Sequence, residues 1–340
     1  MKATVLRAPG SAAIEQVPEP ETTGNNDILL KVRNIGLCGS DLNSYRGRNP
    51  LVTYPRILGH EIAATVAAFN PHHPQWQPGD AVTVSPYTSC GRCASCRRDR
   101  ANACQFNQTL GVQRDGALTE FIAVPAERLY RADLSLRELC LVEPLTVGFH
   151  AASRGRVAPS DTVVVIGCGG VGLGAVAGAA FRGATVIAID VEDSKLATAR
   201  KAGAAHTINS TRQDLHTQLA AITSGHGPDV IIEAIGLPQT FRAAVEEVAF
   251  TGRVVYIGYA KQEVAYETRL FVQKELDIQG SRNAQPEDFR DVIRMLEEHH
   301  FPVDDAITHT VAMDEAPQIL AAWDRDPSHY GKIMIDVGKA

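Results

Sequence analysis

A histidine and a glutamate stand side by side at positions 60 and 61, directly after a glycine and inside a mostly apolar run. An imidazole next to a carboxylate suits a borderline metal such as zinc, and Cys38, a third suitable ligand, lies a short way upstream. Glu143, before Pro144, is a further candidate acid in the chain. Taken singly, each residue has an ordinary alternative: a buried cysteine, a core histidine or an acid that starts a helix. Together, His60, Glu61, Cys38 and Glu143 raise the hypothesis of a catalytic zinc centre.

Four of the seven cysteines crowd into one polar loop with the spacing C-x2-C-x2-C-x7-C, namely Cys90, Cys93, Cys96 and Cys104. Four thiolates at this spacing can surround one zinc ion in a closed, structural site. Nearby arginines can offset its negative charge, at Arg92, Arg97, Arg98 and Arg100. An iron–sulfur cluster is the alternative, but the last spacing is longer than in the bacterial ferredoxin run. The loop therefore predicts a structural zinc, in a reducing compartment where disulfides are rare.

A glycine-rich turn follows a Thr-Val-Val-Val-Ile run and opens a helix-like stretch, with the sequence Gly167-Cys168-Gly169-Gly170-Val171-Gly172. In this context a G-x-G-x-x-G turn binds the pyrophosphate of a dinucleotide, because glycines permit close approach and the helix N-terminus stabilises negative charge. Asp190 ends the next predicted strand, where its carboxylate can accept hydrogen bonds from ribose hydroxyls. No arginine immediately follows it to hold a 2′-phosphate, so NAD is expected rather than NADP. A glycine-rich turn without a ligand is the alternative.

Two kinds of domain are expected to position these residues, because the pattern of elements changes near residue 151. Residues 1–150 alternate short β-like runs with proline and glycine, as in Ile28–Ile35 and Ile57–Phe69, which indicates a mostly β domain. From Thr162 onward, apolar strands such as Thr162–Ile166 and Val230–Glu233 alternate with amphipathic helical stretches. That alternation is typical of a doubly wound parallel sheet of the α/β class.

The last part of the chain is too short to form a domain alone. It contains a predicted helix at Pro286–Glu298 and a terminal strand at Lys332–Val337. We expect this tail to pack on the first domain, so that residues 1–150 and 284–340 form one domain and residues 151–283 the other. The uncharged run Val163–Phe181 is long enough to raise the possibility of a membrane span. Its many glycines and the dinucleotide turn favour a strand, turn and helix instead.

The composition is that of a globular protein, with 44% hydrophobic and 21% charged residues over 340 positions. The formal net charge is −6, and no cluster of lysine and arginine dominates a predicted face. Nucleic acid and anionic membranes are therefore not expected as partners. The N-terminus enters a strand-like pattern without the apolar segment of a secretory signal, so a cytoplasmic location is expected.

Taken in order, these motifs resemble those of the zinc-dependent medium-chain dehydrogenases. The residues that carry the resemblance are Gly36-x-Cys38-Gly39-Ser40-Asp41, Gly59-His60-Glu61, the four-cysteine loop, Glu143-Pro144-Leu145 and the dinucleotide turn. The resemblance covers essentially the whole chain. It implies a GroES-like catalytic domain interrupted by a Rossmann domain, two zinc ions per chain, NAD as cofactor, and a homodimer or homotetramer paired through Rossmann edge strands.

By this resemblance, Cys38 and His60 ligate the catalytic zinc, and either Glu61 or Glu143 completes the protein ligands. A glutamate at 143, where the best-known alcohol dehydrogenases have cysteine, makes the chain similar to the polyol and sorbitol branch. In that branch the second acid can act through a zinc-bound water, and Glu61 is therefore ranked slightly ahead of Glu143 as the direct ligand.

Three further positions have counterparts in the family. Ser40 would take the proton of the substrate hydroxyl and pass it towards solvent. Relatives often carry a histidine at the place of Asn43 to finish that relay. Lys195 matches a second contact to the ribose, and its alternative is a solvated helix residue.

The segments Arg48-Asn49-Pro50 and Gly280-Ser281-Arg282-Asn283-Ala284 look most like those of bacterial L-galactonate and L-gulonate dehydrogenases. An arginine can grip both oxygens of an aldonate carboxylate, which makes Arg48 and Arg282, beside Asn283, candidates for substrate binding. Pairing with a local carboxylate or carbonyl is the alternative for each arginine.

The expected reaction is oxidation of a secondary alcohol of a sugar acid, with zinc as Lewis acid and hydride transfer to NAD. Neutral polyols, such as sorbitol, xylitol or galactitol, and L-threonine are alternative substrates. A different class of function is a zinc-free quinone reductase or a structural cofactor-binding protein. Such relatives lack the set formed by Cys38, His60 and Glu143.

Overall fold

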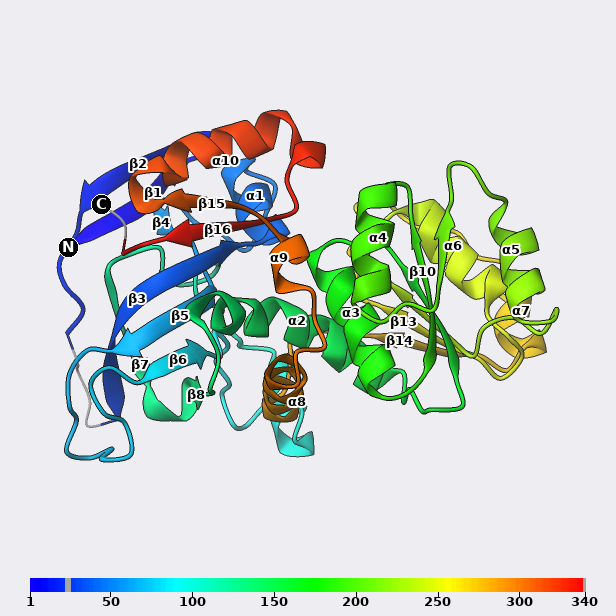
Figure 1. Ribbon diagram of the computed structural model, residues 1–340, viewed down its shortest axis with the longest axis horizontal. Helices are drawn as coiled ribbons and strands as arrows, with labels where there is room; N and C mark the ends of the chain where they lie inside the picture. The colour runs from blue at the N-terminus through cyan, green and yellow to red at the C-terminus, as the bar shows by residue number, and fades with distance from the viewer. Residues whose placement is uncertain (22–25, 339–340) are drawn as a thin grey trace. The chain divides into compact units, whose positions relative to one another are not determined.

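The computed structural model describes residues 1–21 and 26–338, and the chain divides into two compact units (Figure 1). Unit 1 comprises Met1–Glu143 and Val303–Ala340, and unit 2 comprises Pro144–Pro302. The sequence pattern predicts boundaries at residues 150 and 284. In the structure the units divide within helix α2 (Leu136–Arg154) and just ahead of the short helix α9 (Val303–Ala306).

Unit 1 is built on a seven-stranded sheet, in which β7 (Phe121–Pro125) pairs beside the main path of strands. That path runs in the order β15 (Ile307–Ala312), β16 (Lys332–Asp336), β3 (Asp27–Leu37), β5 (Glu61–Val66), β6 (Ala81–Val84) and β8 (Leu129–Arg131). A second sheet has the order β2 (Ser11–Gln16), β1 (Lys2–Ala8) and β4 (Arg56–Ile57). This mostly β architecture matches the expectation for the first 150 residues.

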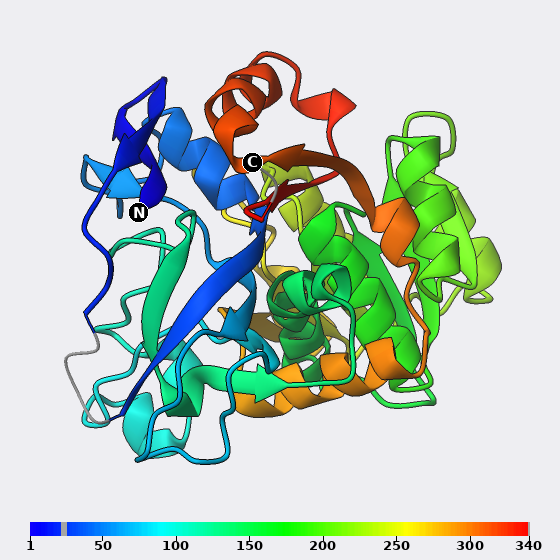
Figure 2. The same cartoon turned by 60° about the vertical axis from the view of Figure 1, so that its left-hand side comes forward.

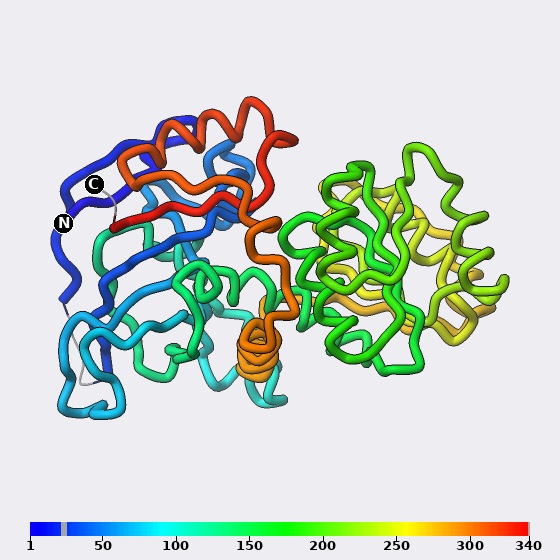
Figure 3. The backbone as a smooth tube through the Cα atoms, viewed as in Figure 1, coloured from blue at the N-terminus to red at the C-terminus, as the bar shows by residue number. Residues whose placement is uncertain are grey.

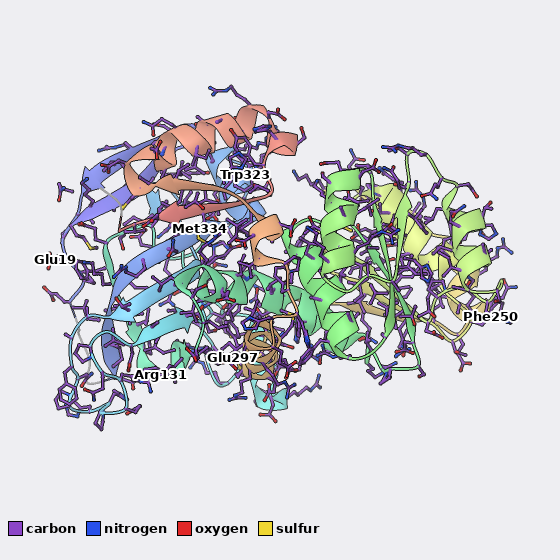
Figure 4. All side chains as sticks on the ribbon, viewed as in Figure 1. Glu19, Arg131, Phe250, Glu297, Trp323 and Met334 are labelled. Carbon is purple, nitrogen blue, oxygen red and sulfur yellow. The ribbon has the colours of Figure 1, made fainter. Side chains whose placement is uncertain are left out.

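The tail from Val303 onward belongs to unit 1, whereas residues 284–302, with helix α8 (Pro286–Glu297), belong to unit 2. Strand β16 pairs antiparallel with the end of β3, with Ile333 opposite Leu37 and Met334 opposite Gly36. Figures 2 and 3 show the red terminal strand beside the blue β3. Trp323 of helix α10 (Ala316–Arg325) is buried in the same hydrophobic core, and Met334 is also buried (Figure 4).

Unit 2 is a six-stranded parallel sheet with helices on both faces (Figure 1). Its strand order is β11 (His206–Asn209), β10 (Thr185–Asp190), β9 (Thr162–Ile166), β12 (Val230–Glu233), β13 (Arg253–Tyr256) and β14 (Asp277–Gly280). Its helices are α3 (Gly170–Phe181), α4 (Asp193–Lys201), α5 (Leu215–Ile222), α6 (Pro238–Glu247), α7 (Arg269–Gln273) and α8 (Pro286–Glu297). This is the doubly wound α/β sheet that the sequence predicted.

The apolar run Val163–Phe181 is a buried strand, the glycine-rich turn and helix α3. Helix α3 packs closely on α2: a Cβ on Gly148 would stand 2.0 Å from the backbone nitrogen of Ala175. Small residues are needed at this contact, which explains the glycine and alanine content of the run. Among the described residues, no helix combines the length and apolarity needed to cross a membrane.

Candidate active site

Cys38, His60 and Glu61 meet at one end of the unit 1 sheet. Cys38 follows β3 and precedes helix α1 (Gly39–Tyr45), whereas His60 and Glu61 stand at the start of β5. Since β3 and β5 run antiparallel with Gly36 opposite Glu61, the end of one strand lies beside the beginning of the other. One potential ligand atom from each of Cys38, His60 and Glu61 lies within 4.8 Å of the others. This group can hold a metal ion.

The charges around His60 fit a divalent cation. Its Nδ1 lies 3.8 Å from Oδ1 of Asp41, and neither atom has a hydrogen-bond partner within the described ranges. Burial alone would lower the pKa of His60, but Asp41 and Cys38 outweigh it and hold that pKa well above the usual range. Desolvation raises the pKa of Asp41. Among the described residues, the buried acids Asp41, Glu61 and Glu143 have one ammonium group between them, that of Lys332, so a zinc ion would supply further positive charge.

Glu61 also forms an ion pair with Lys332, a residue outside the sequence motifs. The Nζ of Lys332, the first residue of β16, lies 2.5 Å from Oε1 and 2.7 Å from Oε2 of Glu61. The same Nζ donates to the carbonyl of Leu37 over 3.2 Å. The Glu61 side chain passes over Gly36, where a Cβ would stand 1.9 Å from Oε2. An ionised carboxylate offers about four lone-pair sites, so Glu61 can accept from Lys332 and still face a metal.

Glu143 is buried in α2, next to Pro144, and lies outside the group within 4.8 Å. Its Oε1 accepts a hydrogen bond from the hydroxyl of Tyr87, a residue that sequence reasoning missed. Desolvation raises the pKa of Glu143, although the charge of His60 acts in the opposite direction. Desolvation and Glu143 keep the pKa of Tyr87 well above its usual range, so Tyr87 stays a hydrogen-bond donor.

The residues predicted to transfer the proton or bind the substrate lie on α1 and on two turns. The Oγ of Ser40 is buried and makes no hydrogen bond to any described residue. Arg48 is exposed in the turn that follows α1. In unit 2, Arg282 is exposed and Asn283 is half-buried, just after β14. Asn283 has a positive φ of 52°, a conformation that asparagine adopts more readily than most residues.

The four cysteines of the loop form a second group, with ligand atoms within 4.8 Å of one another. The sulfur of Cys93 lies 3.5 Å from that of Cys96 and 3.8 Å from that of Cys104. Tetrahedral coordination with Zn–S bonds of about 2.3 Å places sulfurs about 3.8 Å apart. Hydrogen bonds, first that from Ser95, lower the pKa of Cys93 to about 5, whereas desolvation raises that of Cys96 to about 11. The geometry of the sulfurs fits zinc, and none of the described cysteines forms a disulfide.

The glycine-rich turn of unit 2 has the shape needed for a dinucleotide. Gly167 has a φ of 98°, and a Cβ on Gly172 would stand 1.8 Å from the carbonyl oxygen of Gly167. Gly169 and Gly170 are exposed at the N-terminus of α3, and nothing lies within 4 Å of a Cβ built on Gly169. Val171, the next residue of α3, is half-buried. The turn is therefore tightly packed at Gly172 and open at Gly169, and the open side can accept a pyrophosphate.

Asp190 and Lys195 lie at the C-terminal end of β10 and in α4. Oδ2 of Asp190 accepts from the backbone N–H of Cys168 over 2.7 Å, and Oδ1 accepts from that of Val191 over 2.8 Å. These bonds fix the carboxylate beside the glycine-rich turn. The ammonium of Lys195 lies 2.7 Å from Oε1 of Glu192.

Comparisons with known proteins agree with this arrangement. Residues 24–133 match the alcohol dehydrogenase GroES-like domain, and residues 170–298 match the zinc-binding dehydrogenase family. An uncharacterized zinc-type alcohol dehydrogenase-like protein of Haemophilus influenzae is 36% identical over 98% of each chain. The L-galactonate-5-dehydrogenase of Escherichia coli is 32% identical over 86% of each chain. The sorbitol dehydrogenase of Bacillus subtilis is 38% identical over 82% of this chain and 81% of its own.

Among solved structures, an alcohol dehydrogenase from Escherichia coli CFT073 complexed with NADH has a TM-score of 0.89. It is 28% identical to this chain, and the match covers 99% of both chains. The two family matches cover the two units in the order that the motifs predicted. With these matches and a full-length relative above 30% identity, the chain belongs to the family of zinc-binding, medium-chain alcohol dehydrogenases.

Proposed function

We propose that this enzyme uses NAD and zinc to oxidise a secondary hydroxyl group of a sugar acid. The observation that carries the proposal is the convergence of ligand atoms of Cys38, His60 and Glu61 within 4.8 Å. Ser40, two residues after Cys38, has a buried Oγ with no hydrogen-bond partner among the described residues. The four-cysteine loop would hold a second, structural zinc. A zinc-free quinone reductase or a purely structural protein does not need the group formed by Cys38, His60 and Glu61.

When bound, zinc would act as a Lewis acid on the substrate hydroxyl and NAD would accept the hydride. Cys38 and His60 would hold the zinc, with Glu61 as the favoured third ligand and Glu143 as the alternative. The carboxylate of Asp41, 3.8 Å from Nδ1 of His60, would orient the imidazole.

Two hydroxyl-bearing residues have separate tasks in this proposal. The Oγ of Ser40, buried without a partner within the described ranges, would accept the proton that leaves the substrate and release its own hydroxyl proton towards solvent. Tyr87 would hold Glu143 through its hydrogen bond to Oε1. Neither side chain would form a covalent bond to the substrate.

The cofactor would lie on unit 2. The N–H groups of Gly169 and Gly170, two exposed residues at the start of α3, would receive the pyrophosphate. Asp190 would accept hydrogen bonds from the ribose hydroxyls. A 2′-phosphate in place of the 2′-hydroxyl would be repelled by the Asp190 carboxylate. This favours NAD over NADP and agrees with the NADH-bound structural neighbour.

The substrate class is inferred from two arginines and from the relatives. Arg48 and Arg282 are exposed, and either guanidinium can bind a sugar-acid carboxylate in the bidentate manner. One relative is an L-galactonate-5-dehydrogenase. A neutral polyol is the second candidate, because the sorbitol dehydrogenase of Bacillus subtilis is 38% identical to this chain.

A homodimer or homotetramer is part of the proposal. Strand β14 stands at the end of the strand order of unit 2, and its Ile278 side chain is 40% exposed. An unpaired strand edge with an exposed apolar residue is suited to pairing with a second copy. Light scattering would measure the mass, and a monomer at micromolar concentration would contradict this part.

Kinetics of NAD reduction with aldonates, polyols and L-threonine test the choice of substrate. We expect the highest kcat/KM with an aldonate such as L-gulonate or L-galactonate. Substituting Arg48 or Arg282 by methionine should raise KM for the aldonate and leave the KM for sorbitol little changed. Oxidation of sorbitol or xylitol without oxidation of any aldonate would instead establish the polyol alternative.

A further inference from the structure

Two cations next to the end of β10 are each paired with an acid of the same turn. Lys195 Nζ lies 2.7 Å from Oε1 of Glu192, and a guanidinium nitrogen of Arg212 lies 2.5 Å from Oδ2 of Asp193. Glu192 and Asp193 come directly after β10 at the N-terminal end of α4, close to Asp190. The turn therefore carries three carboxylates and two cations.

Arg212 lies beside this turn although it comes from the loop that follows β11. Asn209, the last residue of β11, pairs with Asp190, and the N–H of Ser210 donates to the carbonyl of Asp190 over 3.1 Å. The amide of Asn209 donates to Oδ1 of Asp193 over 2.6 Å and to the carbonyl of Val191 over 3.2 Å. These bonds fasten the loop after β11 to the loop after β10, at the edge where the adenosine ribose binds in such sheets.

We propose that Glu192 and Asp193 are specificity-determining residues that exclude a 2′-phosphorylated cofactor independently of Asp190. The proposal rests on the proposed function, in which this edge binds NAD. A 2′-phosphate is recognised by arginine or lysine side chains, and here Lys195 and Arg212 are already paired with acids. If Asp190 alone is replaced, the carboxylates of Glu192 and Asp193 still balance the charges of the two cations. The turn then has no net positive charge to attract a phosphate.

The two acids differ in expected strength. The side chains of Lys195 and Glu192 are each 33% exposed, whereas those of Arg212 and Asp193 are 67% and 57% exposed. Solvent and salt screen exposed pairs more strongly. Glu192 should therefore contribute more to the exclusion of NADP than Asp193, and the contribution of Asp193 should be the more sensitive to salt.

Fluorescence titration of the zinc-loaded, full-length protein with NADH and NADPH tests the proposal through binding rather than turnover. The variants are Asp190→Ser, Glu192→Gln, the double variant, and the double variant with Asp193→Asn added. We expect Asp190→Ser to weaken NADH binding with little gain for NADPH. Adding Glu192→Gln should then lower the Kd for NADPH by a further factor of about ten, equivalent to about 1.4 kcal/mol.

The gain for NADPH should shrink when ionic strength is raised to about 1 M, where the screening length falls to about 3 Å. A double variant that binds NADPH no better than Asp190→Ser would overturn the proposal. So would an NADPH affinity of Asp190→Ser that already equals the wild-type affinity for NADH.

A matched control is Glu287→Gln, which neutralises an exposed acid in the first turn of α8, paired i,i+3 with Arg290. It should leave both affinities unchanged, and an equal gain for NADPH there would contradict a local effect of Glu192. A wild-type chain that binds no NADH would contradict the proposed function and this inference together. NADH binding without the gain in the double variant would contradict the inference alone.

Discussion

Glu61 and Lys332 form a buried ion pair across three strands, although they lie 271 positions apart in the sequence. The Glu61 side chain is 1% exposed and that of Lys332 is 9% exposed. Glu61 begins β5, Lys332 begins β16, and β3 lies between these two strands in the sheet. The C-terminal strand therefore fixes the carboxylate that is the favoured third ligand of the catalytic zinc.

Lys332→Met should destabilise the protein by about 3–5 kcal/mol, because it leaves the Glu61 carboxylate buried without its cation. Urea unfolding after removal of zinc with a chelator measures this change, because a zinc ion bound to Glu61 would itself supply positive charge. Lys2→Met is the control, since the Lys2–Asp314 pair has side chains that are 40% and 53% exposed and should contribute about 1 kcal/mol or less. Equal effects of the two substitutions would contradict the structural role of Lys332.

Gly36→Ala should displace Glu61, because the added Cβ would stand 1.9 Å from its Oε2. We expect weaker retention of one zinc ion per chain during dialysis against a chelator, together with lower stability. Gly39→Ala is the control in the same segment, as nothing lies within 4 Å of a Cβ at that position. Full retention of both zinc ions by Gly36→Ala would show that Glu61 is not needed as a ligand and would favour Glu143.

Tyr87→Phe removes the hydrogen bond to the buried Glu143 carboxyl group. The expected cost is about 1–3 kcal/mol, the range for a buried polar group that loses a hydrogen-bond partner. Tyr45→Phe is the comparison, because the Tyr45 hydroxyl donates to the uncharged carbonyl of Gly10 over 3.0 Å. Its cost should be smaller, at about 0.5–1.5 kcal/mol. A larger loss for Tyr45→Phe would contradict the assigned role of Tyr87.

Cys96→Ser should remove the structural zinc and leave the catalytic zinc in place, because the two groups share no residue. Metal analysis should then find one zinc ion per chain, and limited proteolysis should cut the loop between Cys90 and Cys104 sooner. Cys168→Ala is the control, since Cys168 lies in the glycine-rich turn of unit 2 and its sulfur donates to the backbone carbonyl of Ile189 over 3.6 Å. Loss of both zinc ions in Cys96→Ser would contradict independent sites.

His216 gives stability a dependence on pH. Its hydrogen bond to Glu247 raises the pKa of the imidazole above its ordinary value, over an Nδ1–Oε2 distance of 2.9 Å. A raised pKa in the folded state stabilises the protein below the unfolded pKa of about 6.5, and this stabilisation is lost as pH rises through the folded pKa. The urea midpoint of His216→Gln should therefore fall below the wild type at pH about 5.5. The two midpoints should converge at pH about 8.5, and equal differences at both pH values would contradict the effect.

Sequence patterns predicted the parallel strands of unit 2 well because they are buried on both faces. The apolar runs at Thr162–Ile166 and Val230–Glu233 coincide with β9 and β12. Strand β11, with the sequence His-Thr-Ile-Asn, was not predicted, since it stands at the sheet edge and has no apolar run. Helix α2 was missed because Pro144 lies in its middle, where proline usually marks a helix start or a break.

The sequence identified the candidate ligands through their types and spacing, but not the residues that hold them in place. Lys332 reaches Glu61 only because β16 and β5 lie on either side of β3, a register set by long-range pairing. Tyr87 reaches Glu143 because a loop and a helix meet in the core of unit 1. Neither partner has a local sequence signal, so only the folded structure reveals it.

The central claim is that the group formed by Cys38, His60 and Glu61 holds a zinc ion needed for alcohol oxidation with NAD. The most direct measurement pairs zinc content with NADH formation in the wild type and in Cys38→Ser. We predict two zinc ions per chain and NADH formation with an aldonate or polyol for the wild type. Cys38→Ser should keep one zinc ion and lose NADH formation by a factor of about a thousand or more, a loss of about 4 kcal/mol. Undiminished NADH formation in Cys38→Ser, or a wild type that contains two zinc ions and oxidises none of the alcohols, would contradict the account.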